Sequence, residues 1–198
     1  MRFLLLIRYL WEIGLIAQIV QTFVQNHDTQ ECQSLEASVE PWFVPFAYAF
    51  ILLYANRGYP CVFYGDLYGI RGPRPRPPAC DGKLPKLILA RKLYAYGPQI
   101  NYLDQADCAG WTRLGHESHS SGAGLAVVMN AGGNITHKRM SVGSQHAGER
   151  WTDIMGRIKR PVQIDKKGLG LFPIRPRSVG IWISGTAQGR GQMDDLEL

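Results

Sequence analysis

The apolar residues of the chain follow two patterns, and the change from one to the other divides the chain into two parts. Residues 22–28 form a short apolar stretch with a polar tip, which predicts a strand. Residues 42–54 are apolar nearly all round and predict a buried helix. The apolar run over 60–65 predicts a second strand, covered on both faces.

A second helix is predicted over residues 83–97, where Leu87, Ala90, Leu93 and Tyr94 share one face. The order strand, helix, strand, helix over 22–97 is the repeat of a parallel α/β architecture.

Beyond residue 97 the sequence consists of short apolar runs separated by glycine-rich turns. Seven such runs between residues 108 and 184 predict an antiparallel β-sandwich or barrel over 98–184. The remaining residues, 185–198, are polar and glycine-rich and predict a disordered tail. The predicted fold class is therefore α/β plus all-β.

The N-terminal segment, residues 1–21, is apolar and unlike the rest of the chain. It begins like a secretory signal, with Arg2 before an apolar stretch, but Arg8 and Glu12 interrupt that stretch. Its uninterrupted apolar length is too short to span a bilayer. A buried or spurious helical segment is favoured, and a signal or membrane anchor remains the alternative.

Composition narrows the class of protein. A chain of 198 residues with 45% hydrophobic residues can bury a globular core. Its net charge of +6 is spread among acidic residues instead of forming a basic stripe, so no nucleic-acid partner is expected. The four cysteines are widely spaced, which favours reduced thiols over a zinc site or a disulfide framework. Cys61 is expected to be buried, and the cysteine pattern weakly favours the cytoplasm over a secreted location.

Asn26, His27 and Asp28 are the first candidates for chemistry, because they follow a predicted parallel strand. The carboxyl ends of such strands carry the reactive groups in α/β barrels. A carboxylate there can stabilise an oxocarbenium-like transition state, and a histidine can donate to a sugar hydroxyl. The same three residues can equally cap a loop or the next helix.

A second candidate, His116, Glu117 and His119, is read as an exposed loop. Its two histidines are three residues apart in a glycine- and serine-rich turn, whereas the metalloprotease pattern needs them four apart on a helix.

The segment FVQNHDTQ resembles the α-amylase family of glycoside hydrolases, whose seventh barrel strand carries the pattern F-V-x-N-H-D. The resemblance continues through GYPCVFYGDLYG, ARKLYAYG, GWTRLG, GLAVVMNAGG and KRMSVG, and covers nearly all of residues 22–184. It implies that residues 22–97 are the last two βα units of a (β/α)8 barrel, followed by a β-sandwich C-terminal domain. It also implies an α-glucan substrate such as starch, glycogen or maltooligosaccharides, endo-hydrolysed at α-1,4 bonds with retention; no membrane partner is expected.

The resemblance further assigns roles to single residues. Asp28 matches the transition-state-stabilising aspartate, and His27 matches a histidine that binds the sugar. Asp107, Asn130 and the carbonyl of Ala106 resemble calcium ligands between the barrel and the C-terminal domain. Because bacterial members carry an acid where this chain has Asn130, calcium binding is expected to be weakened here.

The family's nucleophile and general acid come from strands that precede the F-V-x-N-H-D motif, and residues 1–21 do not resemble those strands. The chain is therefore predicted to be a C-terminal α-amylase fragment that is catalytically incompetent. The alternative is a non-catalytic glucan-binding or regulatory module that uses Trp111, Trp151 and Trp182 to stack on sugars, although these side chains are better explained as core.

Overall fold

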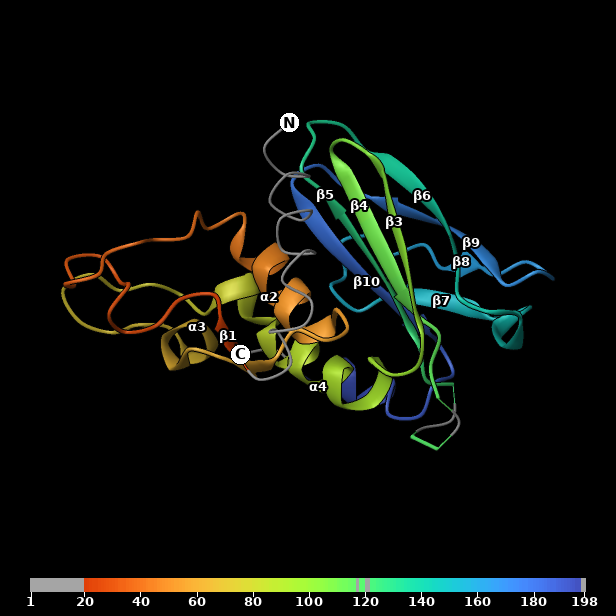
Figure 1. Ribbon diagram of the computed structural model, residues 1–198, viewed down its shortest axis with the longest axis horizontal. Helices are drawn as coiled ribbons and strands as arrows, with labels where there is room; N and C mark the ends of the chain where they lie inside the picture. The colour runs from red at the N-terminus through yellow and green to blue at the C-terminus, as the bar shows by residue number, and fades with distance from the viewer. Residues whose placement is uncertain (1–19, 117, 120–121, 197–198) are drawn as a thin grey trace.

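A computed structural model describes residues 20–116, 118–119 and 122–196 of the chain (Figure 1). The predictions made for residues 1–19, and for Glu117 of the histidine-rich loop, lie outside this range. Within the described part of the chain, no helix has the length and apolar character needed to cross a bilayer.

The predicted strand–helix–strand unit is present. Strand β1 (Gln21–Phe23) pairs in parallel with β2 (Tyr59–Cys61), and helix α2 (Val44–Leu53) lies between them in sequence. Both strands have only three residues, so β1 ends well before Asp28. Helix α2 is buried on most sides, with Phe46, Tyr48 and Leu53 fully enclosed, as its apolar pattern predicted.

The prediction of a second strand over 60–65 is wrong beyond Cys61, where β2 ends. After β2 the chain turns into a short helix, α3 (Tyr64–Tyr68), because the amides of Asp66 and Leu67 both donate to the carbonyl of Phe63. Strand β1 offers only three residues for pairing, so a longer β2 would have no ladder partner. Cys61 is exposed, which corrects the expectation that it is buried.

A short 3-10 turn, η1 (Ala79–Gly82), leads into helix α4 (Leu84–Tyr94), which packs against α2. The buried side chains of α4 include Leu87, Ala90 and Tyr94, which confirms the predicted apolar face.

The C-terminal part is antiparallel throughout. A six-stranded sheet has the order β3-β4-β5-β10-β7-β8, and a separate two-stranded sheet pairs β6 with β9. The strands are β3 (Gln99–Gln105), β4 (Cys108–Arg113), β5 (Leu125–Asn130), β6 (Thr136–Ser141), β7 (Arg150–Asp153), β8 (Val162–Gln163), β9 (Leu169–Ile174) and β10 (Ser178–Ser184). Strand β3 is the one that the sequence did not predict.

The central strands of the large sheet, β4, β5 and β10, are buried on both faces. On one side Trp151 and Trp182 pack with Phe172 of β9, between the two sheets. On the other side Trp111 and Ile181 pack into one apolar cluster with α2 and α4. Figure 1 shows the helices and the β6–β9 pair on opposite sides of the large sheet. The residues before and after Gly97 therefore share a continuous core.

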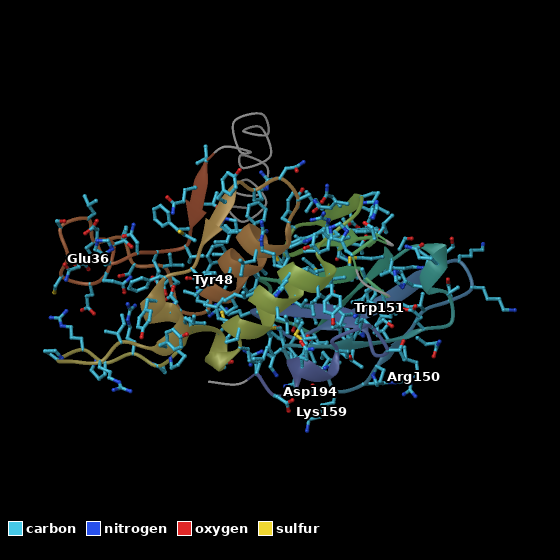
Figure 2. The ribbon with its side chains drawn as sticks, turned by 90° about the horizontal axis from the view of Figure 1, so that it is seen from below. Glu36, Tyr48, Arg150, Trp151, Lys159 and Asp194 are labelled. Atoms are coloured by element: carbon cyan, nitrogen blue, oxygen red, sulfur yellow. The ribbon has the colours of Figure 1, made fainter. Side chains whose placement is uncertain are left out.

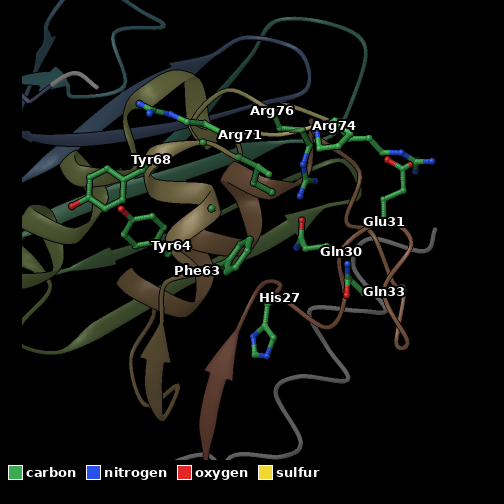
Figure 3. Close-up of a pocket in the computed structure, with 14 residues that line it drawn as sticks. His27, Gln30, Glu31, Gln33, Phe63, Tyr64, Tyr68, Arg71, Arg74 and Arg76 are labelled. Carbon is green, nitrogen blue, oxygen red and sulfur yellow. The ribbon is translucent and has the colours of Figure 1, made fainter.

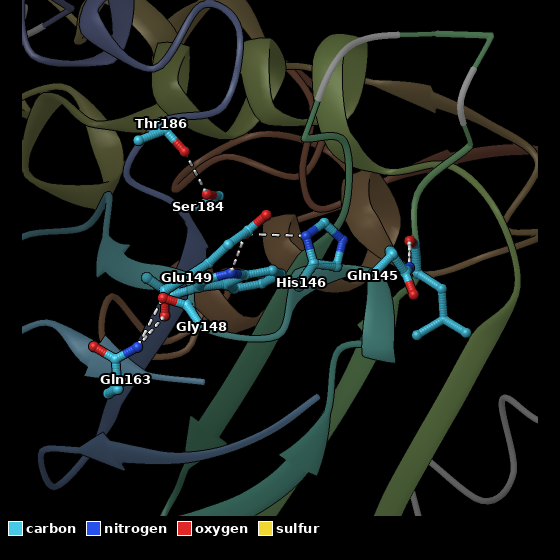
Figure 4. A network of polar contacts seen from close by, with 9 residues as sticks. Gln145, His146, Gly148, Glu149, Gln163, Ser184 and Thr186 are labelled. Carbon is cyan, nitrogen blue, oxygen red and sulfur yellow. Dashed lines mark hydrogen bonds and ion pairs between the residues drawn. The ribbon is translucent and has the colours of Figure 1, made fainter. Parts of the chain in front are cut away.

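The loop that enters β7 is fixed by a polar network around Glu149 (Figure 4). The indole nitrogen of the buried Trp151 donates to Glu149 Oε2 over 2.9 Å, and His146 Nδ1 lies 3.0 Å from the same oxygen. Gln163 Nε2 donates to the carbonyls of Gly148 and Glu149. The carboxylate thus provides a partner for an indole N–H that would otherwise be buried alone.

Residues 185–196 are packed, in contrast to the disordered tail predicted for 185–198. Met193, in the turn η3 (Gly191–Met193), is fully buried, and Arg190 Nε donates to Thr152 Oγ1 over 3.0 Å. Tyr94 Oη donates to the carbonyl of Gln188 over 2.8 Å. Two buried apolar residues, Ala187 and Met193, and two long-range hydrogen bonds therefore hold a segment whose composition is polar.

Figure 2 places Asp194 on the same side of the molecule as Lys159, with Glu36 at the opposite end from Arg150.

Candidate functional site

A groove of about 890 Å³ opens at the carboxyl ends of β1 and β2 (Figure 3). One wall comes from the loop after β1, with His27, Gln30 and Glu31, and the other comes from α3 and the loop that follows it. The parallel pairing of the two strands directs both loops to the same edge. This is the position where α/β folds commonly bind ligands.

The loop after β1 is shaped by Asn26. Its Oδ1 accepts the backbone N–H groups of Asp28 and Thr29 over 3.0 and 3.1 Å, and Thr29 Oγ1 accepts the N–H of Asn26 over 2.9 Å. These are the contacts of an asparagine-centred turn, which competes with strand pairing. The turn ends the strand early and presents the next two side chains to solvent.

His27 and Asp28 lie next to each other on this turn. His27 Nε2 is 3.4 Å from Asp28 Oδ1, and the side chains are 83% and 48% exposed. His27 lines the groove, whereas Asp28 is not among the lining residues. The pair can offer a donor and a carboxylate to one hydroxyl-bearing ligand at the groove's edge.

Two tyrosines of α3 form an exposed aromatic wall. Tyr64 and Tyr68 are 71% and 53% exposed, and their ring centroids are 4.7 Å apart. Both line the groove with Phe63. Aromatic faces exposed in this way bind apolar surfaces such as the C–H faces of a sugar ring. The sequence prediction missed Tyr64 because it placed this residue in a buried strand over 60–65, and it gave Tyr68 no role; their i, i+4 spacing was the available signal.

The rest of this wall, made by the loop after α3, is basic. Arg71, Arg74 and Arg76 line the groove from the proline-rich loop over 71–78, which Ile70 and Arg76 close through two backbone hydrogen bonds. Arg74 Nη1 pairs with Glu31 Oε1 over 2.5 Å. Because both side chains are largely exposed, this pair aligns the two rims more than it stabilises the fold.

A buried carboxylate supports the groove from below. Asp66 of α3 accepts a 2.6 Å hydrogen bond from Tyr48 Oη of α2 and another from Gln25 Nε2, next to the asparagine-centred turn. Burial raises the pKa of Asp66 above its ordinary value, although both hydrogen bonds oppose that change. Asp66 therefore joins α2, α3 and the β1 loop.

Three carboxylates in or near the groove therefore have different partners. Glu31 is paired with Arg74, Asp66 is enclosed with Tyr48 and Gln25, and Asp28 stands beside His27. Retaining glycoside hydrolysis needs two carboxyl groups about 5 Å apart across the scissile bond. Glu31 and Asp66 are each held by partners of their own, Glu31 by Arg74 and Asp66 by Tyr48 and Gln25.

The residues matched to a calcium site lie together at the end of β5. A Cβ added to Gly132 would lie 3.2 Å from Asn130 Oδ1 and 3.3 Å from Asp107 Cβ, so both side chains flank this glycine. Asn130 is buried: its Nδ2 donates to the carbonyls of Asn134 and Arg175, and its Oδ1 accepts the N–H of Gly132.

These residues do not fit a calcium site well. Calcium is bound by several oxygen ligands, with carboxylates supplying the charge. Here one exposed carboxylate, Asp107, stands beside an amide that already makes three hydrogen bonds, and the Ala106 carbonyl is the only other matched ligand. Throughout the described part of the chain, no three His, Cys, Asp or Glu side chains gather at a distance that suits a metal.

The three tryptophans considered for sugar stacking are buried. Trp111, Trp151 and Trp182 are each at most 1% exposed. They belong to the two apolar clusters on either side of the large sheet. A sugar cannot reach these rings in the folded chain.

Comparison with known proteins gives one consistent relationship. A family model described as α-amylase C-terminal matches residues 125–183, from β5 through most of β10. Over 163 residues the chain is 49% identical to the α-amylase of Bacillus licheniformis, a match that covers 82% of this chain and 31% of that protein. Over 170 residues it is 38% identical to the cytoplasmic α-amylase of Escherichia coli, covering 82% of this chain and 33% of that protein. The chain spans about a third of the length of these relatives.

Solved structures agree at the level of the fold. An Anoxybacillus α-amylase superposes with a TM-score of 0.61 at 16% identity, over 89% of this chain and 41% of that one. The α-amylase of Geobacillus thermoleovorans, solved in complex with acarbose, gives a TM-score of 0.55 at 13% identity over 89% of this chain and 43% of that one.

Proposed function

The chain belongs to the α-amylase family, and from this premise we propose that its groove binds an α-1,4-glucan without hydrolysing it. The observation that carries the proposal is the placement of His27 and the Tyr64–Tyr68 wall in one groove at the carboxyl ends of β1 and β2. The ligand follows from the family, whose relatives are named as α-amylases.

Residues 22–97 are, in this proposal, the last two βα units of a (β/α)8 barrel, and 98–184 are its C-terminal sandwich. Support comes from the parallel register of β1 and β2, with α2 between them and α3 and α4 following β2. In such barrels the carboxyl ends of the strands carry the active site, which agrees with the position of the groove.

The proposed roles follow from the side chains. Tyr64 and Tyr68 pack on the faces of glucose units, and His27 donates to a hydroxyl of the unit at the rim. In an intact parent enzyme, Asp28 stabilises the positive charge that develops at the anomeric carbon.

Hydrolysis by residues 1–198 alone is not expected. We infer this from the partners of the neighbouring carboxylates: Glu31 is paired with Arg74, and Asp66 is buried and accepts a hydrogen bond from Tyr48. A transition-state-stabilising carboxylate such as Asp28 supports hydrolysis only together with a nucleophile and a general acid, and we assign neither role to Glu31 or Asp66.

Affinity electrophoresis in gels with and without amylose tests this function. We expect retardation of the chain by amylose, and a loss of about two- to tenfold in affinity in Tyr64→Ala, as the value of one aromatic contact implies. Phe23→Ala is the control, because Phe23 is also an exposed aromatic residue, at 48%, but lies outside the groove. Equal migration with and without amylose, or equal loss in both variants, contradicts the proposal.

A further inference from the structure

A second hollow, of about 580 Å³, lies at the other end of β2. Its walls are the C-terminal ends of α2 and α4, the loop over 54–59 that leads into β2, and Arg113 at the end of β4. It shares no lining residue with the groove. The residues that line the groove lie in the β1 loop, over 27–33, and after β2, over 63–76. We call this hollow the cationic pocket.

The cationic pocket is lined by four basic side chains and no acidic one. The basic residues are Arg57, Arg91, Lys92 and Arg113. Burial lowers the pKa of both Arg91 and Arg113, and the charge of Arg91 lowers the pKa of Arg113 further. Like charges held together in a partly buried hollow raise the free energy of the empty pocket, and an anion relieves this repulsion.

The guanidinium groups are held in place by the fold. Arg91 Nη1 donates to the carbonyl of Leu52 over 2.6 Å, and Arg113 donates through Nε and Nη2 to the carbonyl of Gly97. The guanidinium of Arg57 lies 4.8 and 4.5 Å from the ring centroids of Phe50 and Tyr54. Fixed cations of this kind bind with little loss of side-chain entropy.

Donors remain for a ligand. A guanidinium has five N–H groups. Arg91 uses one nitrogen and Arg113 uses two, and the other N–H groups of these two side chains have no acceptor in residues 20–116, 118–119 and 122–196. Planar guanidinium groups with free donors match the oxygens of phosphate in pairs.

The rim of the pocket is aromatic as well as basic. Tyr59 is largely exposed, Tyr96 is half-buried, and both line the pocket with Ile88. These side chains offer surface to an organic group attached to the anion, with one face of the Tyr96 ring already stacked on His119 at 3.8 Å between ring centroids. A volume of about 580 Å³ holds an anion together with such a group.

We propose that the cationic pocket binds a phosphate monoester, with Arg91, Lys92 and Arg113 around the phosphate dianion and Tyr59 and Tyr96 against the group it carries. Four positive charges exceed what a single carboxylate needs and suit a dianion. Since the pocket and the groove share no residue, the proposal stands or falls independently of glucan binding.

Isothermal titration of the 198-residue chain at constant ionic strength tests the proposal, with inorganic phosphate, glucose 6-phosphate and glucose as probes. Saturable binding of both phosphates, and none of glucose, is expected. Tighter binding of glucose 6-phosphate than of inorganic phosphate supports a monoester ligand, whereas equal affinity overturns the role given to the tyrosines. No saturable binding of either phosphate overturns the site.

Two variants locate the site. Arg113→Gln is expected to weaken glucose 6-phosphate binding about tenfold, because a charge-assisted hydrogen bond is lost. Lys92→Gln is expected to weaken glucose 6-phosphate binding about threefold. It removes only the positive charge of an exposed side chain, so folding is preserved. Lys159→Gln is the matched control, since it removes one exposed positive charge outside the pocket. Unchanged affinity in Lys92→Gln, or equal weakening in Lys159→Gln, overturns the assignment.

Discussion

Tyr48 of α2 donates a 2.6 Å hydrogen bond to the buried carboxylate of Asp66 in α3, directly beneath the groove. Tyr48 is fully buried, and Asp66 also accepts from Gln25 of the β1 loop. The three segments that form the groove therefore meet at one carboxylate, and the shape of the groove depends on it.

Removal of this hydrogen bond should destabilise the fold. Tyr48→Phe leaves a buried carboxylate with one donor fewer, and we expect a loss of about 2 kcal/mol in the free energy of unfolding at pH 7. Urea denaturation measures it. Tyr68→Phe, at an exposed ring, should change the free energy by less than about 0.5 kcal/mol.

The effect should also depend on pH. Burial raises the pKa of Asp66 above 3.8, so the charged form is disfavoured in the folded state and its protonation there begins at a higher pH than in the unfolded chain. As pH falls through the raised pKa, the charge that Tyr48 stabilises disappears, and the difference between wild type and Tyr48→Phe should shrink. A difference that grows on acidification would contradict this role of Asp66.

Asn130 should hold the end of β5 without a metal. Chelation by EDTA is expected to leave the melting temperature unchanged, because three hydrogen bonds of Asn130 occupy the amide. Asn130→Asp cannot donate to the carbonyls of Asn134 and Arg175 and adds charge beside Asp107, so we expect a loss of about 2–4 kcal/mol.

The control for that variant is Asn134→Asp, which adds the same charge at an exposed side chain. Thermal melts with EDTA and with calcium separate the possibilities. A large fall in the wild-type melting temperature on chelation would show that the matched residues bind a metal after all.

Two buried tryptophans should respond differently to phenylalanine. Trp111 Nε1 donates to the carbonyl of Leu53 over 3.3 Å, whereas Trp182 Nε1 is buried without a partner among the described residues. Both substitutions replace an indole with a smaller phenyl ring. Trp111→Phe also removes a hydrogen bond, whereas Trp182→Phe removes a donor that has no partner among the described residues. We expect Trp111→Phe to be the more destabilising by about 1 kcal/mol. Equal midpoints in urea would refute this.

The sequence predicted the elements that have strong apolar periodicity. Helices α2 and α4 and the seven strands β4 to β10 agree with their apolar patterns. The run after Cys61 was misassigned because an apolar run of strand length looks the same whether or not a partner strand is available, and β1 stops at Phe23. The order of residues 185–196 depends on the burial of Met193, a tertiary contact that a polar composition conceals.

The candidate site was predicted only in part. His27 and Asp28 were recognised from their place after a strand, and the structure brings them to the edge of the groove. Tyr64, Tyr68 and the arginines of the proline-rich loop reach the same groove through folding, so no local pattern joined them to His27. Asp28 was matched to a family motif by resemblance, and such a match does not reveal that Glu31 pairs with Arg74 or that Asp66 accepts from Tyr48.

The most direct test of the account is the fate of maltoheptaose incubated with the 198-residue chain, at a concentration where amylose retards the chain in a gel. Reducing ends are measured over time, with Asp28→Asn run in parallel. The account predicts intact maltoheptaose in both samples. A steady release of reducing ends by the wild-type chain, abolished in Asp28→Asn, would contradict it.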